Sequence, residues 1–493
     1  MRALFVMIPL LYSLRSGIRV EKGGGSFLIV SDIPLNVIRV REGVAKILRL
    51  CDGTRTLEEI ANACGVTEGQ VFALSEYFNR KGVLEIGPAP GGCYAPTVAV
   101  IIPTRDRASE LAECLRSVTS QDYGEGRIEV IVVDDGSRDG TADLVRAFPC
   151  RLMRNIESRG QSYCRNLAVA QARAEILAFI DSDCVAEPTW LREIVPYFQW
   201  ERVGAVGGCV AGYFHKSALD RYEDAFSPLQ MGSRILYDNG SRSTLYAPTC
   251  NLLVRRSVYG ETGGINEKMS VGEDVDFCWR MRRRGYHLLY TPSGVVRHRH
   301  RNELGKMMKR RADYGSSEAL LYTLHREKQK TFQVAPLSAL AFLSFSVALV
   351  SFSLWPLFVA AGCLLFEAGR KTVRTRRAGV HIAPWKIAFS LVRTYVSFSY
   401  FVSFHVVRYY LVLLLPLGFF FPPYRPLCLF MLALASLVDY TVKRPRLIFP
   451  LFFFYYLLDH LAYQAGVLRG CMRVGTLRPY KPKFLRKLVA HGG

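Results

Sequence analysis

The middle of the 493-residue sequence predicts an α/β fold built on a mostly parallel, Rossmann-like sheet. Residues 98–102, 129–133 and 176–180 are short runs dominated by apolar side chains, as buried parallel strands are. Helical patterns separate the runs, and a polar cluster follows each of them. Because open α/β sheets bind ligands at the carboxyl ends of their strands, we expect the three clusters to meet at one functional edge.

A small α+β domain is predicted before the sheet, within residues 1–90. Two short strand patterns, at residues 17–20 and 26–30, precede three helical patterns. The third helix opens with Thr67 and has Gln70 three residues later, as a capping box requires, and it ends at Gly82. The Pro- and Gly-rich residues 87–92 predict a linker, which places the sheet domain at residues 97–325.

Residues 331–493 are predicted to form an apolar helical region associated with a membrane. Residues 331–366 contain no charged side chain, a length sufficient to cross a hydrocarbon core of roughly 30 Å. Basic residues flank this run on both sides, which disfavours a single crossing and favours a hairpin or helices lying in the interface. Residues 469–487 carry seven basic residues and no acid, as a strip facing anionic lipid would. An unusually apolar soluble helical domain is the alternative.

Charge and cysteine content narrow the function classes. The formal net charge of +22 suggests nucleic acid, an anionic membrane or phosphate-bearing substrates. The N-terminal domain shows little clustered base-reading chemistry, so no nucleic-acid partner is expected. The 13 cysteines include no C-x-x-C pair and predict reduced, packed side chains. The first twelve residues lack a convincing cleavage site for a signal peptide.

Carboxylates after the second and third apolar runs form the core of the candidate site. Asp181 and Asp183 directly follow residues 176–180 in an Asp-x-Asp pattern. Carboxylates at a strand end can hold a divalent metal, which neutralises the charge that develops on a phosphate leaving group. Asp134 and Asp135 follow the second run, where a carboxylate can accept hydrogen bonds from a nucleoside; an Asx turn is the structural alternative.

Flanking residues extend this candidate site. Pro103, Thr104 and Asp106 end the first run and are candidates to touch the nucleoside. Arg165 opens a predicted helix and is a candidate to hold pyrophosphate, with an ion pair as the alternative. His298 follows strand-like residues and is a candidate to complete the metal or phosphate site, although a basic membrane-facing segment explains the same residue.

The predicted catalytic residues open an amphipathic helix. An attacking hydroxyl must lose its proton, and a nearby carboxylate can accept it. Asp274 is the candidate base, and Glu273 is expected to support it. Acids at a helix start also stabilise the helix dipole without any catalysis, which is the competing interpretation.

Four segments, in this order, resemble the family 2 glycosyltransferases with a GT-A fold. They are Val-Ala-Val-Ile-Ile-Pro-Thr-Arg-Asp-Arg, Val-Val-Asp-Asp-Gly-Ser, Phe-Ile-Asp-Ser-Asp and Gly-Glu-Asp-Val-Asp-Phe-Cys-Trp-Arg, within about residues 97–300. The resemblance implies an inverting transfer from a UDP-sugar with Mg or Mn. By position, Asp183 matches the family's metal ligand and Asp274 its base, while Asp106 and Asp135 match the uridine contacts.

The N-terminal domain is similar to the winged-helix-like peptide-recognition elements of ribosomally made peptide pathways, through Leu57-Glu-Glu-Ile-Ala and Leu84-Glu. An open strand edge beside a helix can bind an extended peptide by strand addition. The order of domains resembles the glycosyltransferases of mycofactocin biosynthesis. That likeness implies UDP-glucose as the donor and mycofactocin, a peptide-derived redox cofactor, or its precursor as the acceptor of a short β-linked oligosaccharide. Because basic residues flank the apolar run on both sides, we expect the protein at the cytoplasmic membrane, with its catalytic domain on the cytoplasmic side.

Two other functions remain open. The acceptor of the same transfer could be an envelope glycan or a lipid, although a lipid-directed enzyme has no evident need of a peptide-binding domain. A peptide-binding scaffold with an inactive transferase domain is the alternative of another class, and the intact Asp181, Asp183, Glu273 and Asp274 oppose it. Residues 309–315 stand where processive β-glucan synthases carry Gln-x-x-Arg-Trp, so a translocating channel is not expected.

Overall fold

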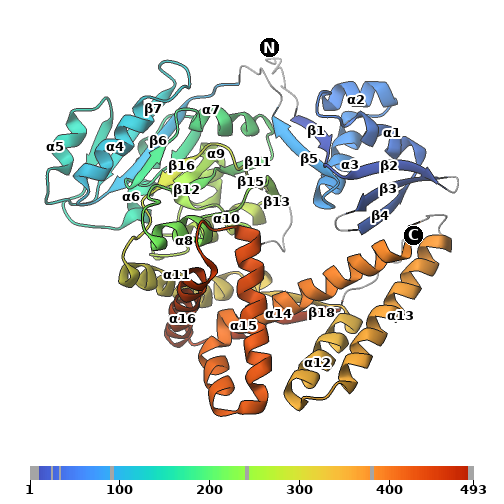
Figure 1. The fold of residues 1–493 in the computed structure, drawn as a ribbon. Helices are drawn as coiled ribbons and strands as arrows, with labels where there is room; N and C mark the ends of the chain where they lie inside the picture. The colour runs from blue at the N-terminus through green and yellow to red at the C-terminus, as the bar shows by residue number, and fades with distance from the viewer. Residues whose placement is uncertain are drawn as a thin grey trace.

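The predicted mostly parallel sheet is present and has eight strands. Figure 1 shows helices packed around it. The computed structural model describes residues 10–23, 26–32, 35–88, 94–238, 244–377 and 382–486, so most of the predicted linker lies outside the described residues. Only β13 and β14 run antiparallel to their neighbours. The strand order is β13 (Leu236–Asp238), β15 (His287–Tyr290), β11 (Val203–Gly207), β14 (Leu252–Arg255), β9 (Ile176–Phe179), β6 (Val98–Thr104), β7 (Ile128–Asp134) and β8 (Arg151–Arg154).

The three apolar runs form β6, β7 and β9, which lie side by side and parallel. They are apolar throughout because helices cover both faces of the sheet. Along β6, Val100 and Ile102 belong to one core while Ala99 and Ile101 belong to the other. The covering helices are α4 (Ala108–Thr119), α5 (Thr141–Arg146), α6 (Gln161–Gln171), α7 (Trp190–Ile194), α9 (Arg256–Thr262) and α10 (Glu273–Arg283).

A second, three-stranded sheet lies next to the carboxyl end of β9. It consists of β10 (Cys184–Ala186), β16 (Val296–His298) and β12 (Val210–Gly212). Because β10 starts directly after Asp183 and pairs Cys184 with His298, it brings two segments that are more than a hundred residues apart to one point. The helix α8 (Ala218–Phe226) follows β12.

The N-terminal residues form an α+β unit beside the large sheet (Figure 1). An antiparallel meander of β2 (Ile18–Gly23), β3 (Ser26–Asp32) and β4 (Leu35–Val40) leads into α1 (Glu42–Leu50), α2 (Leu57–Cys64) and α3 (Glu68–Arg80). The predicted capping box of Thr67 and Gln70 is present at the start of α3. β5 (Leu84–Pro88) returns to pair with β1 (Leu10–Leu14), and Phe72 packs edge-on against Trp200 of the catalytic unit.

The C-terminal region is helical, as predicted, but the uncharged run is not one helix. It divides between β17 (Thr331–Val334), α12 (Pro336–Ser351) and the first part of α13 (Trp355–Arg377), which packs against α12 as a hairpin. Phe352, with φ of 54°, ends α12 after 16 residues, a length of about 24 Å. No single piece of the uncharged run is therefore long enough to form the membrane-spanning helix that its composition suggests.

Two other helices are long and apolar enough to cross a bilayer, by length and composition. They are α14 (Pro384–Phe420) and the segment Pro422–Lys443, which contains α15 (Arg425–Lys443). Large apolar side chains on α12 to α14 face outward, each between 61% and 78% exposed: Leu343, Phe352, Trp355, Phe358, Leu365, Trp385, Phe389, Leu413, Phe419 and Phe420. In Figure 1 these helices gather on the side of the molecule away from the large sheet.

The last long helix, α16 (Phe449–Val474), packs backbone to backbone on α11 (Leu304–Leu324). Glycines permit this approach, because a Cβ at Gly466 or Gly470 would overlap a backbone oxygen of α11. The predicted basic strip is partly occupied by this contact, since Arg469 pairs with Asp313 of α11 at 2.9 Å. The chain then closes with β18 (Lys483–Arg486), which pairs in parallel with β17, and Lys487 lies outside the described residues.

We predict that Gly466→Ala destabilises the protein by roughly 1–3 kcal/mol, because an added methyl group forces α16 away from α11. The matched control is Gly362→Ala in α13, where a Cβ would meet nothing within 4 Å. That change should be neutral or stabilising by up to about 1 kcal/mol. Thermal unfolding of both variants in detergent measures the difference, and equal unfolding temperatures would contradict the packing.

Candidate active site

A cavity of about 640 Å³ opens at the carboxyl edge of β6, β7 and β9 and extends to α11, α14 and α16. Eight of the residues predicted from the sequence line it: Pro103, Thr104, Asp135, Asp181, Asp183, Glu273, Asp274 and His298. Asp106, Asp134 and Arg165 were predicted with them but are not among its lining residues. The polar clusters that we expected to meet at one edge of the sheet therefore line a single cavity.

Asp183 and His298 form a site that suits a divalent cation. Pairing of β10 with β16 brings His298 Nε2 to 3.6 Å from Asp183 Oδ1. That carboxylate oxygen is buried and accepts no hydrogen bond from the described residues. Buried polar atoms normally have a partner, and a bound cation would supply one here. The Cys184 Sγ lies within the same group of potential ligand atoms, all within 4.8 Å of one another.

The second oxygen of Asp183 is held by arginines. Arg107 donates to it at 2.5 Å and Arg301 lies 3.7 Å away. Burial alone would raise the pKa of Asp183, but His298, Arg107 and Arg301 bring that pKa below its ordinary value. The carboxylate therefore stays charged.

Asp181 is held differently from Asp183. Its carboxylate accepts a hydrogen bond from Arg165 Nη2 at 2.6 Å, and the Nη1 of the same guanidinium lies 3.3 Å from Glu273. Arg165 is fully buried on α6. Its guanidinium thus joins the end of β9 to the start of α10 through two ion pairs. The structure therefore shows Arg165 in the ion pair that was the alternative to holding pyrophosphate.

The three aspartates predicted to contact the nucleoside occupy different places. Asp135 lines the cavity and accepts hydrogen bonds from Asn155, Ser158 and two backbone amides, which outweigh burial and lower its pKa to about 2. Asp134 is buried outside the cavity, where it accepts the Ser137 amide and pairs with Arg154. Asp106, with φ of 49°, accepts the Arg138 amide and also lies outside the cavity.

Glu273 and Asp274 start α10 immediately after Gly272. Gly272 has φ of 80°, and a Cβ there would lie 3.1 Å from Ser317 Oγ, so both conformation and space favour glycine. Burial, followed by the charge of Asp274, raises the pKa of Glu273 to about 7. Burial also raises the pKa of Asp274 above its ordinary value. Two carboxyl groups that titrate closer to neutrality than usual therefore face one cavity.

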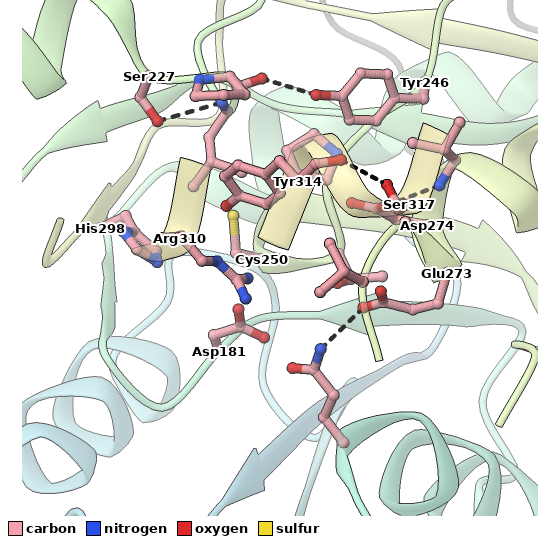
Figure 2. Close-up of a pocket in the computed structure, with 18 of the residues that line it drawn as sticks. Asp181, Ser227, Tyr246, Cys250, Glu273, Asp274, His298, Arg310, Tyr314 and Ser317 are labelled. Carbon is pink, nitrogen blue, oxygen red and sulfur yellow. Dashed lines mark hydrogen bonds between the residues drawn. The ribbon is translucent and has the colours of Figure 1, made fainter. Parts of the chain in front are cut away.

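Sequence reasoning did not identify the contribution of α11. Figure 2 shows Arg310, Tyr314 and Ser317 of this helix projecting into the cavity that holds Asp181 and Asp274. Tyr314 lies against Arg310, whose guanidinium carbon is 4.7 Å from the ring centre. The spacing of these three residues places them on one helix face, which was the available sequence signal.

Comparisons with known proteins agree with this arrangement. Residues 99–263 match the family model described as glycosyl transferase family 2. The chain is 30% identical over 262 residues to the pre-mycofactocin glycosyltransferase of Mycobacterium tuberculosis, covering 52% of this chain and 54% of that protein. The chain thus spans about half the length of the first curated relatives that it matches.

Two further likenesses concern archaeal proteins. The chain is 32% identical over 238 residues to glycosyltransferase AglE of Haloferax volcanii, covering 47% of this chain and 76% of that protein. A mannosyltransferase of Pyrobaculum calidifontis, solved with GDP-Man and Mn²⁺, aligns with a TM-score of 0.39 and 22% identity over 62% of this chain and 87% of that one. The family match and the extent of the likeness to AglE show that this chain belongs to the family 2 glycosyltransferases.

Proposed function

We propose that this chain is an inverting glycosyltransferase that moves glucose, or another hexose, from a UDP-sugar to mycofactocin or its peptide-derived precursor. The observation that carries the proposal is the single cavity joining the Asp183–His298 pair to Asp274. The acceptor is supported by the relative whose name describes action on pre-mycofactocin, and by the α+β unit that precedes the catalytic sheet. An envelope glycan or a lipid is the alternative acceptor.

At the donor end, Asp183 and His298 would hold Mg²⁺ or Mn²⁺, and Asp181 lies next to them. The bound cation would neutralise negative charge on the departing nucleotide. Asp135 stays charged and can accept hydrogen bonds from the nucleoside, while the buried Thr104 hydroxyl, which has no partner among the described residues, can donate one. Pro103 shapes the same end of the cavity, and Asp106 and Asp134 support its loops from outside.

At the acceptor side, Asp274 removes the proton of the attacking hydroxyl. A carboxylate with a raised pKa is a stronger base near neutral pH than an exposed one. Glu273 supports this base electrostatically and, through Arg165, keeps α10 in register with Asp181. In this proposal Arg165 positions the site, and the cavity-lining Arg310 faces the pyrophosphate.

The remaining regions would bring the acceptor to the catalytic cavity. The β2–β3–β4 sheet pairs on one side only at each edge strand within the described chain, and such an edge can bind a peptide by strand addition. The outward apolar side chains of α12 to α14 suit a lipid environment, so the protein would sit at the cytoplasmic membrane with its catalytic domain on the cytoplasmic side. No nucleic acid is part of this proposal.

The decisive assay incubates purified protein with UDP-glucose, Mg²⁺ or Mn²⁺ and the mycofactocin precursor, and follows hexose additions by mass. Asp274→Asn should reduce transfer by about 10²- to 10⁴-fold, since it removes the base, while UDP binding stays unchanged. Asp143→Asn, at an 81% exposed side chain, is the control and should transfer normally. If hexose is found only on a lipid acceptor, the proposed mycofactocin acceptor is wrong. If Asp274→Asn keeps full activity, the assignment of Asp274 as the base is wrong.

We expect the transfer rate to fall as the pH drops through about 7, because the raised pKa values of Glu273 and Asp274 allow the pair to take up a proton there. Glu273→Gln removes the neighbouring negative charge, which makes Asp274 easier to deprotonate. The acid limb of the pH–rate profile should therefore move to lower pH in this variant. An acid limb at the same pH would show that the pair does not control the rate.

Removal of divalent cations with EDTA should abolish transfer, and added Mn²⁺ should restore it. Asp183→Asn should weaken Mn²⁺ binding by about tenfold or more, since it removes the charged oxygen ligand. Titration of free Mn²⁺ by electron paramagnetic resonance measures this binding without any turnover. Asp106→Asn, outside the cavity, should bind Mn²⁺ like the wild type; equal loss in both variants would contradict the assignment.

A further inference from the structure

The cavity continues past Asp274 into a part that the proposed mechanism does not use. We name this part the distal arm. It lies between α10, α11, Lys330 and the helices α14 and α16, and its walls include Trp279, Glu318, Tyr322, Lys330, Arg408 and Tyr463. Asp274 and these wall residues line the same cavity, so an acceptor whose hydroxyl lies at Asp274 can place its remaining atoms among them.

Trp279 gives the distal arm a hydrogen-bond donor with no partner. The residue is 4% exposed, and its ring packs edge-on against His325 with a centroid distance of 5.2 Å. Its indole Nε1 is buried and makes no hydrogen bond within the described residues. A buried donor normally has a partner, so the unpaired N–H group of this cavity-lining residue calls for an explanation, and we take it as a donor that a bound ligand can use.

The cations of the distal arm are already paired. Lys330 Nζ lies 3.1 Å from Glu318, and Arg408 lies 3.1 Å from Asp459. Arg311, which lines the cavity nearby, contacts both Glu223 and Asp459 at 2.5 Å. A phosphate entering the arm would have to compete with these carboxylates for each cation, which opposes an anionic occupant.

The walls also suit a ring-shaped molecule. Tyr322 and Tyr463 line the cavity, and the guanidinium of Arg408 covers one face of the Tyr463 ring, with its carbon 3.4 Å from the ring centre. Aromatic faces combined with paired polar groups bind flat or hydroxylated rings by stacking and hydrogen bonding.

We propose that the distal arm is the acceptor subsite and that it takes an uncharged, ring-bearing acceptor, hydrogen-bonded to Trp279, in preference to a phosphate-linked lipid. The proposal rests on the proposed function, because it needs the acceptor hydroxyl to reach Asp274. It distinguishes an uncharged acceptor from a phosphate-linked lipid by charge. This argument does not use the N-terminal unit.

The test measures binding to the full-length protein in detergent, in the presence of UDP and Mn²⁺. The probe is 4-nitrophenyl β-glucoside, an uncharged ring-bearing molecule, and farnesyl phosphate is the competitor. The probe should bind and farnesyl phosphate should not displace it. Trp279→Phe, which keeps an aromatic ring but removes the N–H group, should weaken binding of the probe by roughly three- to tenfold. Trp385→Phe, on the exposed side of α14, is the matched control and should bind like the wild type.

Leu321→Phe provides a second variant, because it narrows the distal arm without touching the donor residues. This variant should also bind the probe more weakly, while its affinity for UDP stays unchanged. Displacement by farnesyl phosphate, or wild-type probe affinity in both cavity variants, would overturn the proposal. A weakened probe in a protein that transfers no hexose from UDP-glucose would instead overturn the proposed function and leave the subsite standing.

Discussion

The buried guanidinium of Arg165 is the interaction on which the catalytic geometry depends. It joins the carboxylate after β9 to the first carboxylate of α10, so the donor end and the proposed base keep a fixed relation. A buried arginine without both partners would leave an unpaired charge inside the protein. The two acidic clusters and the arginine therefore stabilise each other, and each cluster keeps its place only while the other is present.

The C-terminal helices complete this arrangement. α11 presents Arg310 and Tyr314 to the cavity on one face, while Arg311 on another face pairs with Glu223 of α8 and Asp459 of α16. The glycines of α16 let the two backbones approach closely enough for these contacts. The apolar C-terminal region is thus part of the cavity wall.

Much of the fold and of the site follows from local sequence. Buried parallel strands appear as apolar runs, and the edge they share explains why Asp135, Asp181 and Asp183 were found together. The burial of Asp134 and Arg165 was not predictable, because it depends on partners such as Arg154 and Glu273 that are distant in sequence. The α11 residues were missed for the same reason. The break at Phe352 escaped prediction because a left-handed residue leaves no trace in hydropathy.

The close packing of α16 on α11 has a consequence for the order of events during synthesis. Arg408 and Tyr463, which line the cavity, belong to α14 and α16, which are made after the strands of the large sheet. The strands of the large sheet and the acidic clusters emerge from the ribosome before α16 does. The nascent sheet domain therefore has an open side until α16 docks, and the completed cavity forms only when the C-terminal helices have assembled.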